Sequence, residues 1–118
     1  MSRPRSLALG WSAAMLALCS IPGEDFGDLE DILFSADKLG HIALFAVFGW
    51  LWLRAAPQRL GAVVLGGVTF GIGIEIWQET VARGRGADVY DVVADLVGLA
   101  LGVGLTLWAQ RRAPGTAA

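Results

Sequence analysis

Polar and ionisable side chains interrupt three otherwise apolar stretches of the sequence, at spacings of three or four residues. They are Asp37, Lys38 and His41; Glu75, Gln78 and Glu79; and Asp88, Asp91 and Asp95. Residues three or four apart share one face of a helix, so each group can point in one direction. A histidine beside carboxylates can transfer protons, bind a cation or hold a polar ligand. These three groups are therefore the candidates for chemistry.

The residue types allow two kinds of reactive site. His41, Glu75 and Asp91 are the candidate catalytic residues, because a histidine or a glutamate can act as general base for a water molecule. The same three residues are the candidate ligands of a metal ion, and their donor atoms are more typical of a Mg²⁺, Mn²⁺ or Ca²⁺ site than of structural zinc. The sequence requires no cofactor, and the nearby Lys38 weighs against a divalent cation.

The composition places these residues in a membrane protein. The chain has 118 residues, of which 55% are hydrophobic and 17% charged, and its mean hydropathy is +0.58. Soluble domains average about 25% charged residues. The net charge of −2 and the dispersed basic residues give no indication of a nucleic-acid partner. The single cysteine, Cys19, excludes an internal disulfide and a cysteine-based zinc site.

Four apolar runs predict four membrane-spanning helices in a single domain over residues 1–118. We expect these helices at about residues 6–21, 38–54, 60–79 and 89–109, with a solvated acidic loop over 23–36 and a disordered tail over 110–118. The first run is expected to be an uncleaved helix rather than a signal peptide. In lipid, helices satisfy every backbone hydrogen bond, and no alternating strand pattern occurs in the sequence. The predicted fold is an all-α antiparallel up-down bundle.

The basic residues predict how the bundle is oriented. With four spans, both termini and the turn over 54–59 lie on one side of the membrane. That side carries six of the nine basic residues, so the positive-inside rule places both termini in the cytoplasm of a cell that inserts the protein in its inner or plasma membrane.

Connectivity brings the polar groups together. The second helix begins, the third ends and the fourth begins on the same face of the membrane, which predicts one polar pocket on the extracytoplasmic side. Its ligand-binding candidates beyond the reactive trio are Asp37, Lys38, Gln78, Arg85, Asp88 and Asp95. An acid facing lipid at the centre of a membrane helix costs about 3 kcal/mol, so we expect Glu75 and Asp95 to face each other or a wet cavity.

Glycines share helix faces with two of these acids: Gly67 and Gly71 with Glu75, and Gly98 and Gly102 with Asp95. Small residues let two membrane helices approach closely. We therefore expect the third and fourth helices to pack on each other through glycine. Their acidic side chains would then meet at the end that the two helices share.

These motifs, taken in order, resemble the VanZ-like family over about residues 12–105. They are Asp37-Lys38-x-x-His41, Glu75-x-x-Gln78, and Arg85 six residues before Asp91, with Gly98 and Gly102 after it. The resemblance implies a small multi-pass protein of a bacterial cell envelope, in a family whose founding members lower susceptibility to the glycopeptide antibiotic teicoplanin. One departure is Asp95, because the family usually has asparagine at this position. A protonated Asp95 can still donate a hydrogen bond as asparagine would, whereas an ionised one adds charge to the pocket.

Three functions are compatible with these residues. The first is binding or modification of an envelope lipid or peptidoglycan precursor, whose headgroup would meet Lys38, Arg83 and Arg85. The second is intramembrane hydrolysis by the reactive trio, with or without a divalent metal. The third is a structural subunit of a larger complex, in which the polar cluster only fixes helix register. The lipid bilayer is a partner in each case, and the lipid-facing surface of four short helices leaves room for self-association.

Overall fold

The computed structural model describes residues 2–20, 30–80 and 89–112, with the side chains of residues 30–37 left undescribed. Four α-helices make up nearly all of this part of the chain, and no strand occurs in it. They are α1 (Arg3–Cys19), α2 (Glu30–Ala55), α3 (Leu60–Thr80) and α4 (Val89–Arg112). The all-α prediction is confirmed for these residues.

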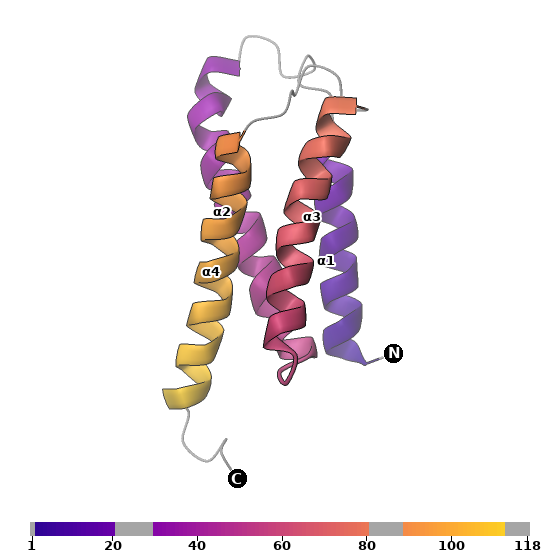
Figure 1. Cartoon of the computed structure of the whole chain (residues 1–118), viewed down its shortest axis with the longest axis vertical. Coiled ribbons are helices and arrows are strands. Elements are labelled where there is room, and N and C mark those ends of the chain that lie inside the picture. Colours follow the sequence, from indigo (N-terminus) through magenta and orange to yellow (C-terminus); the bar gives the residue numbers. More distant parts are fainter. Residues whose placement is uncertain (1, 21–29, 81–88, 113–118) are drawn as a thin grey trace.

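Helices that follow one another in the sequence run in opposite directions. The start of α1 and the end of α4 therefore lie at the same end of the bundle (Figure 1). Among the described helices, α3 and α4 are long and apolar enough to cross a membrane, with mean hydropathies of 1.7 and 1.9 over their most apolar windows. At 1.5 Å per residue they span about 32 and 36 Å, against about 30 Å for a hydrocarbon core. Membrane crossing by α1 and α2 stays a prediction.

The second helix begins earlier than the sequence indicated. It starts at Glu30 rather than near residue 38, so part of the expected acidic loop is helical. No proline or glycine interrupts residues 30–39, and helix formation therefore meets no backbone obstacle there. The fourth helix continues to Arg112, so residues 110–112 of the expected disordered tail are helical. The other observed helix bounds lie within one turn of the expected ones. Residues 21–29 of the loop and 113–118 of the tail lie outside the described residues.

Glycines of α4 pack against α2 rather than α3. A Cβ at Gly98 would overlap the carbonyl group of Ile42, and one at Gly102 would overlap that of Ala46. The two helices run parallel, since residues 42 and 46 meet residues 98 and 102 in the same order. This pair forms the most extensive contact between elements of the bundle. The expectation that the glycines of α4 would face α3 is therefore wrong.

Glycines of α3 do face α4, but they contact its side chains. A Cβ at Gly67 would lie 2.6 Å from a methyl carbon of Leu99, and one at Gly71 would lie 3.1 Å from Oδ2 of Asp95. Because Gly67 and Gly71 have no side chains, they leave space on this face of α3, and Leu99 and Asp95 of α4 fill it. The helices interlock without forming the backbone contact that α2 and α4 make.

The indole groups of Trp11 and Trp52 join α1 to α2 through hydrogen bonds. Trp11 Nε1 donates to the carbonyl oxygen of Leu44 at 3.0 Å, and Trp52 Nε1 donates to Ser12 Oγ, also at 3.0 Å. Each bond crosses between α1 and α2. These bonds hold α1 beside α2, and α1 also contacts α3 (Figure 1).

Candidate functional site

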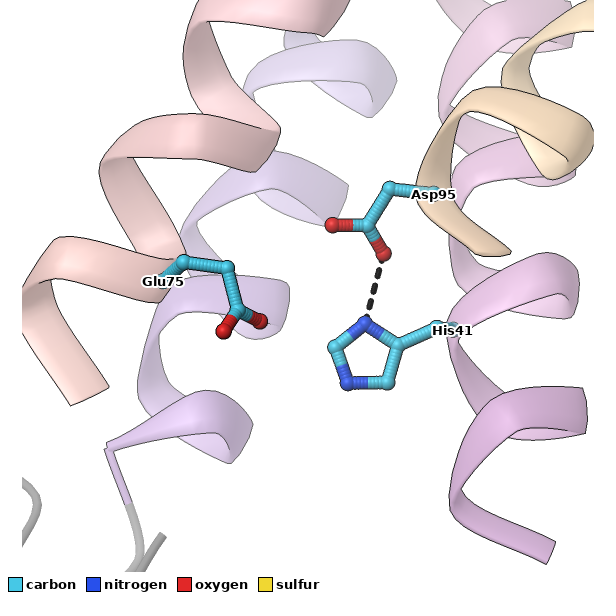
Figure 2. A group of neighbouring side chains, drawn as sticks. All are labelled: His41, Glu75 and Asp95. Carbon is cyan, nitrogen blue, oxygen red and sulfur yellow. Dashed lines mark hydrogen bonds and ion pairs between the residues drawn. The ribbon is translucent and has the colours of Figure 1, made fainter. Parts of the chain in front are cut away.

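Three helices each contribute one buried ionisable side chain to a single cluster, which we call the His41 cluster: His41 of α2, Glu75 of α3 and Asp95 of α4. Their exposed fractions are 3%, 5% and 1%. One nitrogen or oxygen atom from each lies within 4.8 Å of the others. Figure 2 shows the three side chains pointing toward one another from their separate helices. They lie near the end of the bundle opposite the start of α1.

His41 and Asp95 form the closest contact within the His41 cluster. Nδ1 of the imidazole lies 2.5 Å from Oδ1 of the carboxyl group (Figure 2). An ionised Asp95 accepts the Nδ1–H, and a protonated Asp95 donates to an unprotonated Nδ1. Gly71 leaves room for the second carboxyl oxygen, because a Cβ there would lie only 3.1 Å from it. The glycine of α3 thus permits the acid of α4 to reach the centre of the bundle.

Lys38 and Asp91 form an ion pair one helical turn nearer the end of the bundle. The ammonium group of Lys38 donates to Oδ1 of Asp91. The lysine side chain is 25% exposed and that of the aspartate 9%. Oδ2 of Asp91 lies 3.8 Å from Nε2 of His41, so the pair borders the cluster without joining its closest contacts. Both nitrogens of the imidazole therefore face carboxyl groups.

The structure groups His41 and Glu75 with Asp95, whereas the sequence assigned Asp91 to the reactive and metal-binding trio. Both aspartates lie on one stripe of α4, and helical spacing alone does not choose between them. The choice depends on how far α4 is shifted along α2. The backbone contact at Gly98 and Gly102 sets that shift, and it brings Asp95 beside His41 and Asp91 beside Lys38.

The remaining predicted ligand-binding residues are only partly described. Gln78 is 1% exposed, and its Nε2 donates to the carbonyl oxygen of Cys19 at 3.2 Å. Its amide therefore joins α3 to the end of α1. Arg85 and Asp88 lie outside the described residues, as does the side chain of Asp37.

Carboxyl groups outnumber cationic groups around the cluster. Among the described side chains, those of Glu75, Asp91 and Asp95 lie close to one lysine, Lys38, and one histidine, His41. In a buried setting, an excess of acids favours proton uptake, hydrogen bonding or a bound cation. The arrangement can therefore exchange protons between imidazole and carboxyl groups, accept hydrogen bonds from a polar ligand, or supply nitrogen and oxygen atoms to a metal ion.

The comparison with protein families shows the family of the chain. The family model described as VanZ/LLP1 matches residues 6–110, which is nearly the whole sequence. The chain belongs to the VanZ/LLP1 family. Neither the curated proteins nor the solved structures provide a match. Family membership and the two apolar helices together indicate a membrane protein.

Proposed function

We propose that this member of the VanZ/LLP1 family is a multi-pass protein of the cell membrane that binds or modifies an envelope lipid or a cell-wall precursor. In this proposal all four helices cross the bilayer and both termini lie in the cytoplasm. The apolar character of α3 and α4 supports it, as does the distribution of charge, because six of the nine basic residues belong to the termini and the turn over 54–59. The His41 cluster would then lie toward the outer face.

Burial of three ionisable side chains from three helices in one place is the observation that carries the proposal. His41, Glu75 and Asp95 are each at most 5% exposed. Ionisable residues are costly inside a membrane, and their presence there points by default to a functional site. Hydroxyl and amide groups of a lipid or precursor headgroup can donate hydrogen bonds to the carboxyl groups of the cluster. The resemblance to the VanZ-like family directs the functional test toward glycopeptide susceptibility.

Hydrolysis at the same cluster is a second candidate function, favoured by the spacing of its donor atoms. Metal ions bind nitrogen and carboxylate oxygen at about 2.0–2.2 Å, so two ligand atoms on one ion lie at most about 4.4 Å apart. The 4.8 Å that encloses the donor atoms is close to this limit, and a small shift of Glu75 toward His41 and Asp95 would meet it. A divalent cation held there would supply Lewis acidity to a bound water or carbonyl group. Without a metal, His41 could accept the proton of a water molecule.

A purely structural role is the competing explanation, and the geometry makes it testable. The pairs Lys38–Asp91 and His41–Asp95 both join α2 to α4. Glu75 enters from α3 and belongs to neither pair. Its removal should therefore affect function more than the α2–α4 register, whereas a scaffold in which all members cooperate would lose stability.

The experiment compares Glu75→Gln with Glu79→Gln, which changes an exposed glutamate one turn along the same helix. Each variant is expressed in a strain that lacks its own copy, and two quantities are measured: the unfolding temperature in detergent and the teicoplanin concentration that stops growth. We expect Glu75→Gln to unfold within a few degrees of the parent and to lose the effect on susceptibility. Glu79→Gln should retain both properties. Unfolding of Glu75→Gln under the parent's growth conditions would favour the scaffold explanation.

Metal analysis separates the two functional candidates. The purified chain is equilibrated with Mn²⁺ or Zn²⁺, passed through a desalting column and analysed by mass spectrometry for bound metal. One equivalent that is lost in His41→Ala and retained in Glu79→Gln would support the hydrolase. Absence of bound metal from the folded parent would remove the metal-dependent form of this candidate.

A further inference from the structure

Two adjoining cavities lie at the end of the bundle opposite the His41 cluster. One has a volume of about 450 Å³ and lies between α1, α2 and α3. The other has a volume of about 600 Å³ and lies beside the first turn of α1 and the turn that joins α2 to α3. Trp52, Ala56 and Arg59 line both, so the cavities share a wall. Each volume falls within the range of about 300–1,000 Å³ that is usual for small-molecule sites.

The first cavity is an apolar groove with a fixed aromatic wall. Phe48 stacks on Phe70 with ring centroids 5.3 Å apart, and it contacts Trp52 with centroids 6.3 Å apart. The Trp52 indole is held in place by its hydrogen bond to Ser12. Gly66 also lines the groove, one turn before Phe70 on α3, and a Cβ there would meet no atom within 4 Å. The groove can therefore receive an unbranched hydrocarbon chain without displacing a side chain.

The second cavity is lined by cationic side chains. Arg5 and Arg59 line it, and neither guanidinium forms an ion pair with a described residue. Two other arginines at this end of the bundle are stacked on tryptophan rings, Arg54 on Trp50 and Arg112 on Trp108, each at 5.1 Å from the ring centroid. Arg5 and Arg59 thus differ from them in facing a cavity rather than an aromatic ring.

Charge on the bundle is separated between its two ends. The described acidic side chains belong to Glu75, Glu79, Asp91 and Asp95, at the end of α3 and the start of α4. The arginines that the structure describes lie at the other end: Arg3, Arg5, Arg54, Arg59, Arg111 and Arg112. An anion in the second cavity would therefore meet two guanidinium groups and no nearby described carboxylate. Arginine suits phosphate groups in particular, because its planar donors match phosphate oxygens.

We propose that this end of the bundle holds an anionic glycerophospholipid, with its phosphate between Arg5 and Arg59 and one acyl chain along Phe48, Phe70 and Gly66. The shared wall at Trp52 places a cationic compartment directly against an apolar one, which matches the polarity of a phospholipid from headgroup to chain. A cardiolipin or phosphatidylglycerol molecule of the surrounding bilayer has this chemistry. The site is separate from the His41 cluster and does not depend on the function proposed for it.

Native mass spectrometry of the full chain in detergent can test this site. Phosphatidylglycerol is titrated into the parent protein, with phosphatidylcholine and inorganic phosphate as the comparison probes. We expect one phosphatidylglycerol to bind at least about tenfold more tightly than phosphatidylcholine, because the guanidinium groups contact an uncompensated negative charge. Equal retention of the two lipids, or phosphate displacing phosphatidylglycerol at equal concentration, would overturn the proposal.

Matched variants locate the site. Arg5→Gln combined with Arg59→Gln should weaken phosphatidylglycerol binding about tenfold or more, whereas Arg54→Gln combined with Arg112→Gln removes equal charge from the same end and should change it by less than about twofold. If both double variants lost the same affinity for phosphatidylglycerol, overall charge alone would explain the binding. That result would overturn the proposed site. Gly66→Leu fills the groove while every arginine remains, and it should also weaken binding several-fold. Unchanged binding in Gly66→Leu would overturn the acyl-chain assignment.

Discussion

Nδ1 of His41 lies 2.5 Å from Oδ1 of Asp95, joining α2 to α4 inside the bundle. Both side chains are almost completely buried. The contact occurs because Gly98 and Gly102 allow the two backbones to approach, and because Gly71 of α3 leaves space for the aspartate. A small-residue framework thus determines which acid meets the only histidine of the chain.

Substitutions at Asp95 should distinguish the hydrogen bond from the charge. In Asp95→Asn the amide oxygen can accept from Nδ1–H, so we expect the free energy of unfolding to change by less than about 1 kcal/mol. Asp95→Leu leaves the buried imidazole without this partner and should cost about 1–3 kcal/mol. Denaturant titration in detergent measures both values. Equal losses in the two variants would indicate that the negative charge, rather than the hydrogen bond, stabilises the contact.

Gly102→Ala should be strongly destabilising. The added methyl group would overlap the carbonyl of Ala46, and separating two long helices costs about 3 kcal/mol or more. Gly104→Ala is the matched control, because a Cβ there meets no atom within 4 Å. Alanine in a helix is favoured over glycine by about 0.5–1 kcal/mol, so this control should be neutral or stabilising. Thermal unfolding followed by circular dichroism would contradict the α2–α4 packing if both variants behaved alike.

Gly67→Ala and Leu99→Ala should be non-additive. The new methyl group of Gly67→Ala would press on the Leu99 side chain at 2.6 Å, at a cost of about 1–3 kcal/mol. Leu99→Ala creates a cavity at the same point and should itself cost about 2–5 kcal/mol. In the double variant the methyl group occupies part of that cavity, so the loss should be smaller than the sum of the single losses. Additive losses would show that the two residues do not share this space.

The helices follow from the sequence, whereas their packing does not. Apolar runs interrupted by Pro57 and by charged turns predict where helices lie. The acids within residues 23–36 indicate a solvated loop, so the sequence does not predict that α2 begins at Glu30. The preference of α4 glycines for α2 over α3 could not be predicted, because Gly98 and Gly102 would permit close approach to either neighbour.

The membership of the His41 cluster also depends on helix packing that the sequence does not predict. Spacing predicted that His41, Glu75, Asp91 and Asp95 come from helix ends on one face, and the structure places all four close together. Which aspartate contacts His41 depends on the position of α4 along α2, and tertiary packing determines that position. The two cavities beside Arg59, one of which is also lined by Arg5, have no sequence signal apart from basic residues at helix ends.

The pair Lys38–Asp91 should show measurable coupling in a double-mutant cycle of Lys38→Met and Asp91→Asn. The pair is half-buried, with side chains 25% and 9% exposed. We expect a coupling energy of about 1 kcal/mol, above the usual value for exposed pairs and below that for fully buried ones. The cycle is measured by denaturant titration at low and high salt. A coupling of zero at low salt would show that the pair does not contribute to joining α2 and α4.

Nitrogen-15 NMR of the imidazole tests the His41 cluster most directly. The chain has one histidine, so a protein purified with a histidine-free tag gives signals from His41 alone. We predict that Asp95→Asn and Glu75→Gln each shift the imidazole nitrogen resonances, because Asp95 contacts the ring and a Glu75 oxygen lies within 4.8 Å of an imidazole nitrogen. Glu79→Gln should leave them unchanged. Identical imidazole spectra for the parent, Asp95→Asn and Glu75→Gln would contradict the convergence of the three helices on His41.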